Sequence, residues 1–409
     1  MTLIQPFRAL RPAPGRAAEI LAPPYDVLSS AEARARAAGK PWSFLHISKP
    51  EIDLDPAIDP HDPAVYAKAA ENLGRLIAAG VMIRDPKPCY YVYRLTWRGR
   101  PQTGLAVAAS LADYASNRIR KHELTTPVKE DDRVHQIEAV NAQTGPVMIA
   151  YPAAPDIDAM LARAAAGAAA VDVTADDGVR HQLWPIDDDT TIAALTRAAD
   201  ALPAIYIADG HHRSAAALRV AQARGAGTAQ HGAFLAVLFP HHEMTILDYN
   251  RLLRDLNGRS PDQLIAELRR RFSVAASDQP VRPAGSGEFG MFLDRTWYRL
   301  TIRTEFAPGT GGDPIDRLPI TILTRNVIEP LFGVTDPRTD KRIDFVGGAR
   351  GLGELAQRVA SGEMAVAFAL YPTQMPDLMA VADAGGIMPP KSTWFEPKLA
   401  DGMVNHVLD

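Results

Sequence analysis

The hydrophobic positions of this 409-residue chain repeat every two residues in some segments and every three to four residues in others. The first spacing predicts strands, and the second predicts amphipathic helices. Strands are expected at residues 42–48, 90–97, 105–111, 147–151, 204–208, 234–239, 343–346 and 364–370, with two more within 291–302. Helices are expected at residues 63–79, 130–142, 159–170, 189–201, 212–224, 261–271, 315–331 and 352–360.

Strands and helices follow one another without a regular βα rhythm, which favours an α+β fold with mixed sheets and interleaved helices over a doubly wound one. The length suggests two domains. A polar turn at Asn257-Gly258-Arg259-Ser260 is the expected boundary, dividing the chain into residues 1–257 and 258–409. The longest apolar runs, residues 232–240 and 364–372, are too short to span a bilayer and predict buried strands.

The charge balance narrows the classes of partner. The formal net charge is −4 and the sequence pI is about 6.3, with no block of basic residues. Proteins that bind nucleic acid usually present such a block to the phosphates. We therefore expect no nucleic-acid partner and no membrane partner, and any anionic ligand must be bound by a local pocket. The oligomeric state is left open.

Cysteine use and the first residues bear on chemistry and location. Cys89 is the only cysteine, so an intrachain disulfide and a cysteine-based zinc site are excluded. Residues 1–14 contain no apolar segment of the kind found in a secretory signal. The expected location is the cytoplasm.

The chemistry is expected where the strand at residues 204–208 ends. Asp209 follows the strand, Gly210 permits a tight turn, and a helix begins at or near His211. The first backbone N–H groups of a helix have no partners within it, and the helix dipole favours an anion there. A strand, a glycine turn and a helix N-terminus together predict a phosphate-binding site.

The residues that open this helix support the prediction. Arg213 offers a planar pair of donors for two phosphate oxygens, and His211 and His212 donate hydrogen bonds or move protons near neutral pH. The competing interpretation is that Asp209 caps the helix and that the basic side chains are solvated. Two histidines and an arginine directly after a buried strand favour the functional interpretation.

Four separated motifs carry a resemblance to a known family. They are Ala22-Pro-Pro-Tyr-Asp26, Asp209-Gly-His-His-Arg213, Pro389-Pro-Lys-Ser-Thr393 and Phe395-Glu-Pro-Lys398. In this order they resemble domain of unknown function family 1015, over nearly the whole chain. The unit of strand, Asp-Gly-x-His-Arg and helix is also similar to the phosphate loop of the ParB/sulfiredoxin superfamily, whose members bind or cleave nucleotides. Some relatives are kinases of free serine that use ATP, ADP or pyrophosphate.

This second resemblance implies a ParB/sulfiredoxin-like catalytic core in residues 1–257, with residues 258–409 as an α+β region that carries the Pro-Pro-Lys-Ser-Thr segment. It implies a small-molecule kinase that converts free L-serine to O-phospho-L-serine. Asp209 would position Mg²⁺ or hold a histidine in its tautomer, while His211, His212 and Arg213, with Gly210, would bind the transferred phosphoryl group. Such chemistry needs mainly positioning and charge neutralisation.

A general base for the acceptor hydroxyl is expected in the segment from Arg118 to Thr126. Glu123 is chosen because surrounding cations would keep its carboxylate ionised. The competing interpretation is a solvated strand end with surface charges. Lys129 and Arg133, on the following helix, are expected to reach the same anion, as is Arg118.

Two weaker motifs complete the predicted site. Lys391, Ser392 and Thr393 follow two prolines and could close over a phosphate, although prolines also fix structural tails. Tyr25 and Asp26 are expected to line the substrate pocket, the alternative being a simple turn. His241-His242-Glu243 is not expected to bind a metal, because adjacent side chains on an extended chain point to opposite faces.

Three other functions were weighed against the kinase. A ParB-like nucleotide-binding or nucleotide-hydrolysing switch should carry a helix-turn-helix and a basic surface, and the sequence shows neither. A sulfiredoxin-like reductase needs a cysteine in the phosphate loop, which this loop lacks. A non-enzymatic ligand sensor remains open.

Overall fold

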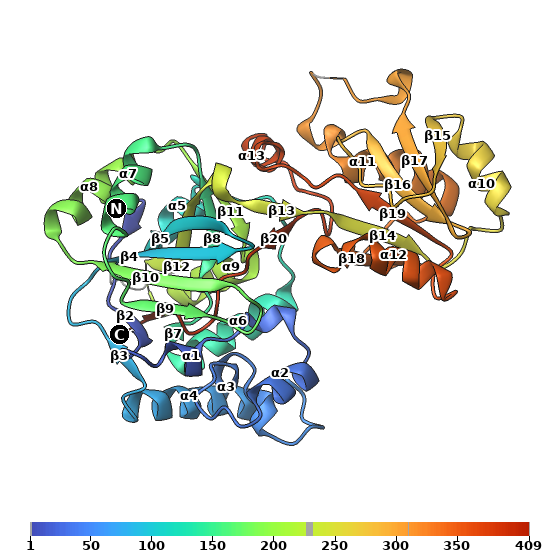
Figure 1. The fold of residues 1–409 in the computed structure, drawn as a ribbon. Coiled ribbons are helices and arrows are strands. Elements are labelled where there is room, and N and C mark those ends of the chain that lie inside the picture. Colours follow the sequence, from blue (N-terminus) through green and yellow to red (C-terminus); the bar gives the residue numbers. More distant parts are fainter. Residues whose placement is uncertain (1, 226–231, 310, 409) are drawn as a thin grey trace. The chain divides into compact units, whose positions relative to one another are not determined.

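The computed structural model describes residues 2–225, 232–309 and 311–408. The chain forms two compact units, one of Met1–Met244 with Pro397–Asp409 and one of Thr245–Glu396 (Figure 1). This division differs from the expected boundary after residue 257. The strands β13 (Thr245–Leu247) and β14 (Tyr249–Leu253) precede that boundary, but their hydrogen-bonded partners lie in the second unit.

A nine-stranded sheet forms the centre of the first unit. Its strands run in the order β6-β11-β8-β12-β5-β4-β10-β9, and β1 pairs with β5. The sheet includes parallel and antiparallel pairs, which confirms the expected mixed sheet. Its strands are β1 (Ile4–Gln5), β4 (Tyr90–Trp97), β5 (Arg100–Ser110), β6 (Ile119–Arg120), β8 (Val147–Tyr151), β9 (Val171–Thr174), β10 (Arg180–Ile186), β11 (Ile205–Asp209) and β12 (Ala233–Pro240).

Helices pack against this sheet because its central strands are apolar on both faces. Every residue of β8 and β12 is buried. The apolar sides of α7 (Pro155–Ala164) and α8 (Asp189–Asp200) join the core of the sheet, as does part of α9 (His211–Arg224). The other side of α9 packs against α6 (Pro127–Val140), through Ala216, Val220 and Ile137.

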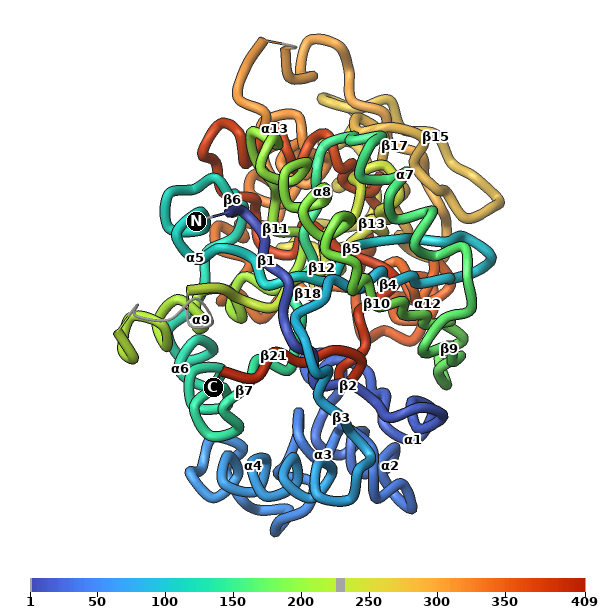
Figure 2. Tube along the Cα trace, turned by 90° about the vertical axis from the view of Figure 1, so that its left-hand side faces the viewer, coloured from blue at the N-terminus to red at the C-terminus, as the bar shows by residue number. Residues whose placement is uncertain are grey.

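A smaller layer ties the two ends of the chain together. The strand β21 (Asn405–Val407) pairs with β2 (Ala9–Pro12) and with β7 (Ala142–Gln143), and β2 also pairs with β3 (Met82–Arg84). Figure 2 shows this red C-terminal strand beside the blue N-terminal one. The helices of this part are α1 (Ala17–Ile20), α2 (Ser30–Ala37), α3 (Leu45–Ser48), α4 (Pro63–Ala78) and, beside the large sheet, α5 (Leu111–Ala115).

The second unit has its own six-stranded sheet and core. The strands run in the order β15-β17-β16-β19-β14-β18, and β13 pairs with β20 outside it. The additional strands are β15 (Phe272–Ser277), β16 (Glu288–Leu293), β17 (Thr296–Ile302), β18 (Ile343–Gly347), β19 (Val366–Leu370) and β20 (Trp394–Glu396). The helices are α10 (Pro261–Leu268), α11 (Pro319–Leu323), η6 (Thr324–Phe332), α12 (Gly351–Ala360) and α13 (Met375–Asp383).

The predicted α+β class is therefore confirmed, one predicted strand is wrong, and one predicted helix is divided. Residues 42–48 form no strand and end in α3, because Phe44, Leu45 and Ile47 are all buried on a short helix instead of alternating between two faces. The helix expected at 315–331 is divided into a 3₁₀ turn, α11 and η6, a π-helix that contains Pro330. Among the described residues, none of the helices has the length and apolar character needed to cross a bilayer.

Candidate anion-binding site

The candidate site begins where β11 ends and α9 begins. Gly210 lies between them in the left-handed region, with φ of 107°, and no side chain caps the helix. A Cβ atom at this position would lie 3.0 Å from Nε of Arg213, so both backbone and space require glycine. The uncapped first turn of a 14-residue helix presents its N–H groups to whatever lies before it, and the helix dipole favours a negative group there.

Asp209 is held between two cations. Its Oδ2 accepts hydrogen bonds from Nη2 of Arg213 at 3.1 Å and from Nζ of Lys398 at 3.3 Å. Burial alone would raise the pKa of this carboxyl, but Lys398 and Arg213 hold the pKa well below its usual range. Asp209 is therefore ionised, and the three side chains together carry one surplus positive charge.

Lys398 reaches the site from the C-terminal segment that returns to the first unit. Its partner Asp209 lies 189 residues earlier in the chain. The pKa of the Lys398 ammonium is raised by Asp209, despite burial, which opposes the charge. The sequence analysis did not place Lys398 among the site residues, although it closes the Phe395-Glu-Pro-Lys398 motif, which was the available signal.

Arg213 is fixed on its other side by the loop before β8. Its Nη1 donates to the carbonyl of Pro146, and a Cβ atom at Gly145 would come within 3.1 Å of Cδ of Arg213. The guanidinium also faces Asp401, a buried carboxyl whose pKa is raised to about 7 by burial. No pattern in the sequence marked Asp401, because an isolated acid near the C-terminus has no distinguishing neighbours.

A pocket of about 460 Å³, its open mouth included, adjoins Arg213 and Asp401. The structure brings Tyr25 and Arg133 to the same pocket, with the Arg133 guanidinium 3.9 Å from the centre of the Tyr25 ring. Arg133 also pairs with its neighbour Asp132 at 2.6 Å. Two of the predicted residues, Tyr25 and Arg133, therefore share one cavity with Arg213.

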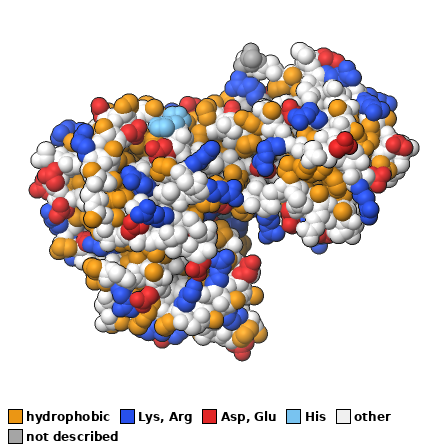
Figure 3. Space-filling model, in the orientation of Figure 1, with side chains coloured by type: hydrophobic (Ala, Val, Ile, Leu, Met, Phe, Trp, Pro, Cys, Tyr) orange, Lys and Arg blue, Asp and Glu red, His pale blue; other side chains and the backbone are white. Residues whose placement is uncertain are grey.

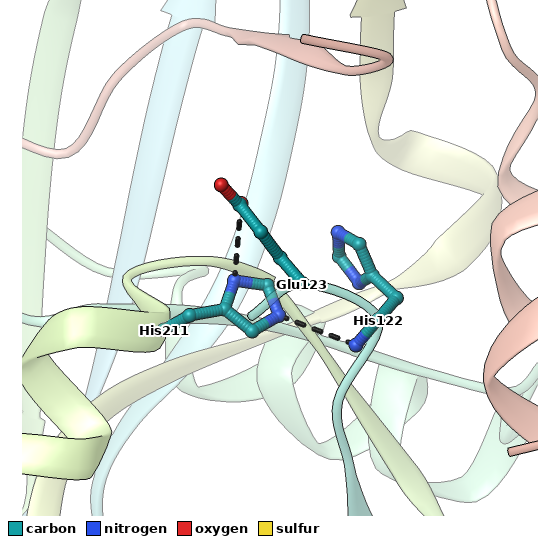
Figure 4. Close-up of side chains that lie close together, drawn as sticks. All are labelled: His122, Glu123 and His211. Carbon is teal, nitrogen blue, oxygen red and sulfur yellow. Dashed lines mark hydrogen bonds and ion pairs between the residues drawn. The ribbon is translucent and has the colours of Figure 1, made fainter. Parts of the chain in front are cut away.

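Two buried histidines, His122 and His211, lie close together beside Glu123 (Figure 4). Nε2 of His211 accepts from the backbone N–H of His122 at 3.4 Å, and Nδ1 lies 3.6 Å from Oε2 of Glu123. The two imidazole rings meet edge to face, with centres 4.4 Å apart. Burial lowers the pKa of His122 to about 4, and burial together with His122 lowers the pKa of His211 well below its usual range. Both rings are therefore neutral at pH 7.

His212 and Arg118 make contacts that hold the fold together. Nε2 of His212 accepts from the backbone N–H of Thr126 at 3.2 Å, which ties α9 to the loop before α6. Burial, followed by Lys129, lowers the pKa of His212. Arg118 pairs with Asp113 at 3.2 Å and donates to two backbone carbonyls before β11. Their predicted phosphate contacts stay predictions, as does that of Lys129.

The remaining predicted residues are exposed or lie in the second unit. The Glu123 side chain is 56% exposed, so a substrate can reach it. Lys391, Ser392 and Thr393 belong to the second unit, where Oγ of Ser392 donates to the carbonyl of Pro389 and the Ser392 carbonyl accepts from Thr373. Their part in the site stays a prediction.

The kinase resemblance implies Mg²⁺, which prefers oxygen ligands. Oδ2 of Asp209, the predicted ligand, already accepts from two cations that would compete with a metal. Among the residues that the structure describes, the side chains whose donor atoms converge, all within 4.8 Å, are His122, Glu123 and His211. Two imidazoles and one carboxylate are typical of transition ions. These residues do not fit Mg²⁺ as an ion held by the protein alone.

The chain is distantly similar to several solved structures. The chain has 14% identity to a conserved hypothetical protein from Pyrococcus furiosus, with a TM-score of 0.35 and coverage of 73% of this chain and 94% of that one. A free serine kinase in complex with AMP shows 12% identity, a TM-score of 0.34 and coverage of 71% and 86%. SbnI with a C-terminal truncation, from Staphylococcus aureus, shows 11% identity, a TM-score of 0.37 and coverage of 73% and 86%.

The comparison with curated proteins gives no match. The model of one protein family, described as a protein of unknown function (DUF1015), matches residues 4–321. That range covers well over half of the chain and includes β11, Gly210 and the start of α9. The chain belongs to the DUF1015 family of proteins of unknown function.

Proposed function

We propose that this protein is a small-molecule kinase that transfers a phosphoryl group from a nucleotide or pyrophosphate to a hydroxyl, with free L-serine as the preferred acceptor. The observation that carries the proposal is the ion cluster at the N-terminus of α9. Asp209 is ionised, and Arg213 and Lys398 both contact its Oδ2. The surplus positive charge and the open helix N-terminus favour a bound phosphate.

The proposed roles follow from where each group lies. Arg213 and Lys398 neutralise the charge that spreads over the phosphoryl oxygens during transfer. Glu123 takes the proton of the acceptor hydroxyl as the new O–P bond forms and the bond to the donor breaks. Its exposure lets a substrate approach, and Nδ1 of the neutral His211 lies 3.6 Å from its Oε2. The donor leaves with the electron pair of the broken bond.

The donor and the acceptor are specified by different arguments. The cluster of Asp209, Arg213 and Lys398 is proposed to bind the phosphates of ATP, ADP or pyrophosphate. Mg²⁺ would arrive bound to the donor's own phosphates. Free serine is proposed from the resemblance of the Asp209–Arg213 motif to that of serine kinases. Tyr25 and Asp26 are proposed to line the acceptor side of the site, since Tyr25 shares a pocket with Arg213.

The test is a transfer assay on the whole chain. Purified protein is incubated with Mg²⁺ and L-serine and with ATP, ADP or pyrophosphate in parallel, and O-phosphoserine is measured by mass spectrometry. Glu123→Gln removes the proposed base from an exposed position, and we expect the rate to fall by about 10²–10⁴-fold. Glu138→Gln changes an exposed carboxylate on α6 in the same way and should leave the rate unchanged.

Two results would overturn the proposal. Absence of phosphoserine with every donor, beside clear nucleotide hydrolysis, would favour the nucleotide-switch alternative. Absence of both product and hydrolysis, beside tight nucleotide binding, would favour a ligand sensor. A product rate that Glu123→Gln leaves unchanged would keep the kinase and remove Glu123 as its base.

A further inference from the structure

The second unit contains a buried arginine that no carboxylate neutralises. Arg251, on β14, is 1% exposed. Its Nη1 donates to the carbonyl of Tyr249 at 2.6 Å, and its Nη2 donates to the carbonyls of Pro390 and Lys391 at 3.2 and 2.9 Å. Within the described parts of the chain, no acidic group lies within ion-pair distance of it. Burying an unpaired charge is costly, so a chain that keeps one has a use for it.

The guanidinium is charged, and its surroundings compensate that charge only in part. Burial lowers the pKa of Arg251 to about 9, which leaves it protonated at neutral pH. Its central carbon lies 4.8 Å from the ring centre of Phe345 and 5.7 Å from that of Tyr249, so aromatic faces contribute some stabilisation. Three hydrogen bonds use three of the five N–H groups that a guanidinium offers. The Nε–H and one N–H of Nη1 remain, and either can donate one hydrogen bond to a carboxylate.

Arg251 lines a pocket of about 790 Å³, its open mouth included. A buried hydroxyl without a hydrogen-bond partner among the described residues lines the same pocket. Oγ1 of Thr321 is buried and has no hydrogen-bond partner among the described residues, while Thr321 as a whole is 6% exposed. The rest of the wall is mostly apolar, through Ile315, Ile320, Ile328, Val334, Ile343 and Pro389. A cation without an anion and a hydroxyl without a partner therefore face one apolar cavity.

The backbone that forms one wall is itself unusual. Thr324, Arg325, Ile328 and Glu329 line the pocket from η6, the π-helix with Pro330 inside it. Stretches of π-helix are rare and are often found at functional sites. The charged residues of this wall are exposed, and Arg325 is already paired with Asp316 at 2.7 Å. They form a rim, and the Glu329 carboxylate there disfavours ligands with several negative charges.

We propose that this pocket binds a small monocarboxylate with an apolar body. The carboxylate accepts from the Arg251 guanidinium and from the Thr321 hydroxyl, and the body packs against the isoleucines of the wall. The Pro389–Lys391 segment then has a defined part, because its carbonyls hold the guanidinium in place. Every residue involved lies in the second unit, so the proposal is independent of the kinase. Figure 3 shows orange hydrophobic side chains between charged ones on the surface of both units.

The test compares a carboxylate with its neutral analogue. 4-Phenylbutyrate and 4-phenylbutanol are titrated into the whole chain near neutral pH, with binding followed by calorimetry. We expect the carboxylate to bind and the alcohol to bind at least about tenfold more weakly, as expected for a charge-assisted hydrogen bond. Arg251→Met should abolish the difference, and Thr324→Phe, which fills the pocket, should abolish binding of both.

Matched variants keep the test decisive. Thr301→Phe makes the same change at an exposed position of β17 and should leave binding unaltered. Thr321→Val keeps the shape of the side chain without its hydroxyl and should weaken binding of the carboxylate severalfold. This variant keeps the test decisive if Arg251→Met fails to fold. Equal affinity for acid and alcohol, or carboxylate binding that survives Thr324→Phe in a folded protein, would overturn the proposal. Phosphoserine formation is expected to be unaffected by Thr321→Val.

Discussion

Each unit withdraws a charged side chain from most of the solvent, Asp209 to 28% and Arg251 to 1% exposure, and the two units compensate the charge in opposite ways. In the first unit, Asp209 has two cationic partners, which carry more charge than they neutralise. In the second unit, Arg251 has only backbone carbonyls and aromatic faces. The first arrangement is stable in itself and still attracts an anion to its open side. The second arrangement leaves the positive charge of Arg251 without an anion, and a bound carboxylate would neutralise it.

The difference shows how a buried charge can indicate function. A fully paired ion is compatible with a purely structural role, so the case for Asp209 depends on the surplus cation and on the open helix N-terminus. An unpaired ion in an apolar wall has no comparable structural role, because an apolar side chain of the same size would serve as well or better. The comparison can be tested by removing charges one at a time.

The largest effect is expected from Arg213→Met. It removes one of the two cationic partners of Asp209, of which Lys398 remains, and it also removes the donor to the Pro146 carbonyl. We expect the free energy of unfolding to fall by about 3–5 kcal/mol, from a lost charge-assisted hydrogen bond and an unsatisfied carbonyl together. Arg219→Met, on the same helix, breaks pairs with Glu130 and Asp131 on a side chain that is 41% exposed. That control should cost less than about 1 kcal/mol. Urea denaturation measures both, and equal losses would contradict the partnership.

The second effect depends on pH and concerns Asp401. Because its pKa is raised to about 7, the folded protein holds a proton that the unfolded chain releases between pH 3.8 and about 7. Stability is therefore lost as the pH rises through this window. Asp401→Asn removes the titrating carboxyl. We therefore expect the free energy of unfolding of the variant, relative to that of the natural protein, to rise by up to about 4 kcal/mol as the pH increases through this window. Thermal melts at several pH values check this, with Asp278→Asn, an exposed carboxyl, as control.

A smaller loss is expected from Arg251→Met. No buried carboxylate is left unpaired, and only the carbonyls of Tyr249, Pro390 and Lys391 lose a donor. We expect a cost of about 1–3 kcal/mol, below that of Arg213→Met, in the same urea experiment. Arg282→Met, at a 68% exposed side chain of this unit, is the reference. A cost above that of Arg213→Met would mean that Arg251 is needed for the fold.

The smallest effect is a gain in stability, opposite in sign to the losses at Arg213 and Arg251. Thr321→Val removes a buried hydroxyl that has no hydrogen-bond partner among the described residues. We expect the free energy of unfolding to rise by about 1 kcal/mol or stay unchanged. Thr301→Val, at an exposed position, should change it little. A clear loss of stability at position 321 would show that the hydroxyl is satisfied in solution, by water, and would weaken the inference drawn from it.

The charge distribution on one face of the molecule is mixed. On the face shown in Figure 3, Lys and Arg side chains alternate with Asp and Glu side chains over both units. The expectation that the protein has no nucleic-acid partner came from the absence of a basic block in the sequence and stays a prediction.

The sequence by itself determined the local unit at the site. A run of apolar residues predicts β11, Gly210 predicts the turn, and the spacing after it predicts α9, because these features depend on neighbours within a few residues. The α+β class and the family followed from the same kind of information, since the order of elements and of motifs is written along the chain. The tight turn at Gly210 was predictable because only glycine adopts a φ of 107° without steric cost, so the residue type itself marks the turn.

Only the tertiary structure decided which charges meet. Lys398 reaches Asp209 across 189 residues, and Arg118, which the sequence grouped with the site, contacts Asp113 and backbone carbonyls. The sequence patterns also did not predict the helix α3 within residues 42–48, the π-helix η6 or the burial of Arg251. Each depends on the packing of segments far apart in sequence, and burial in that packing sets which charges are paired and which titrate.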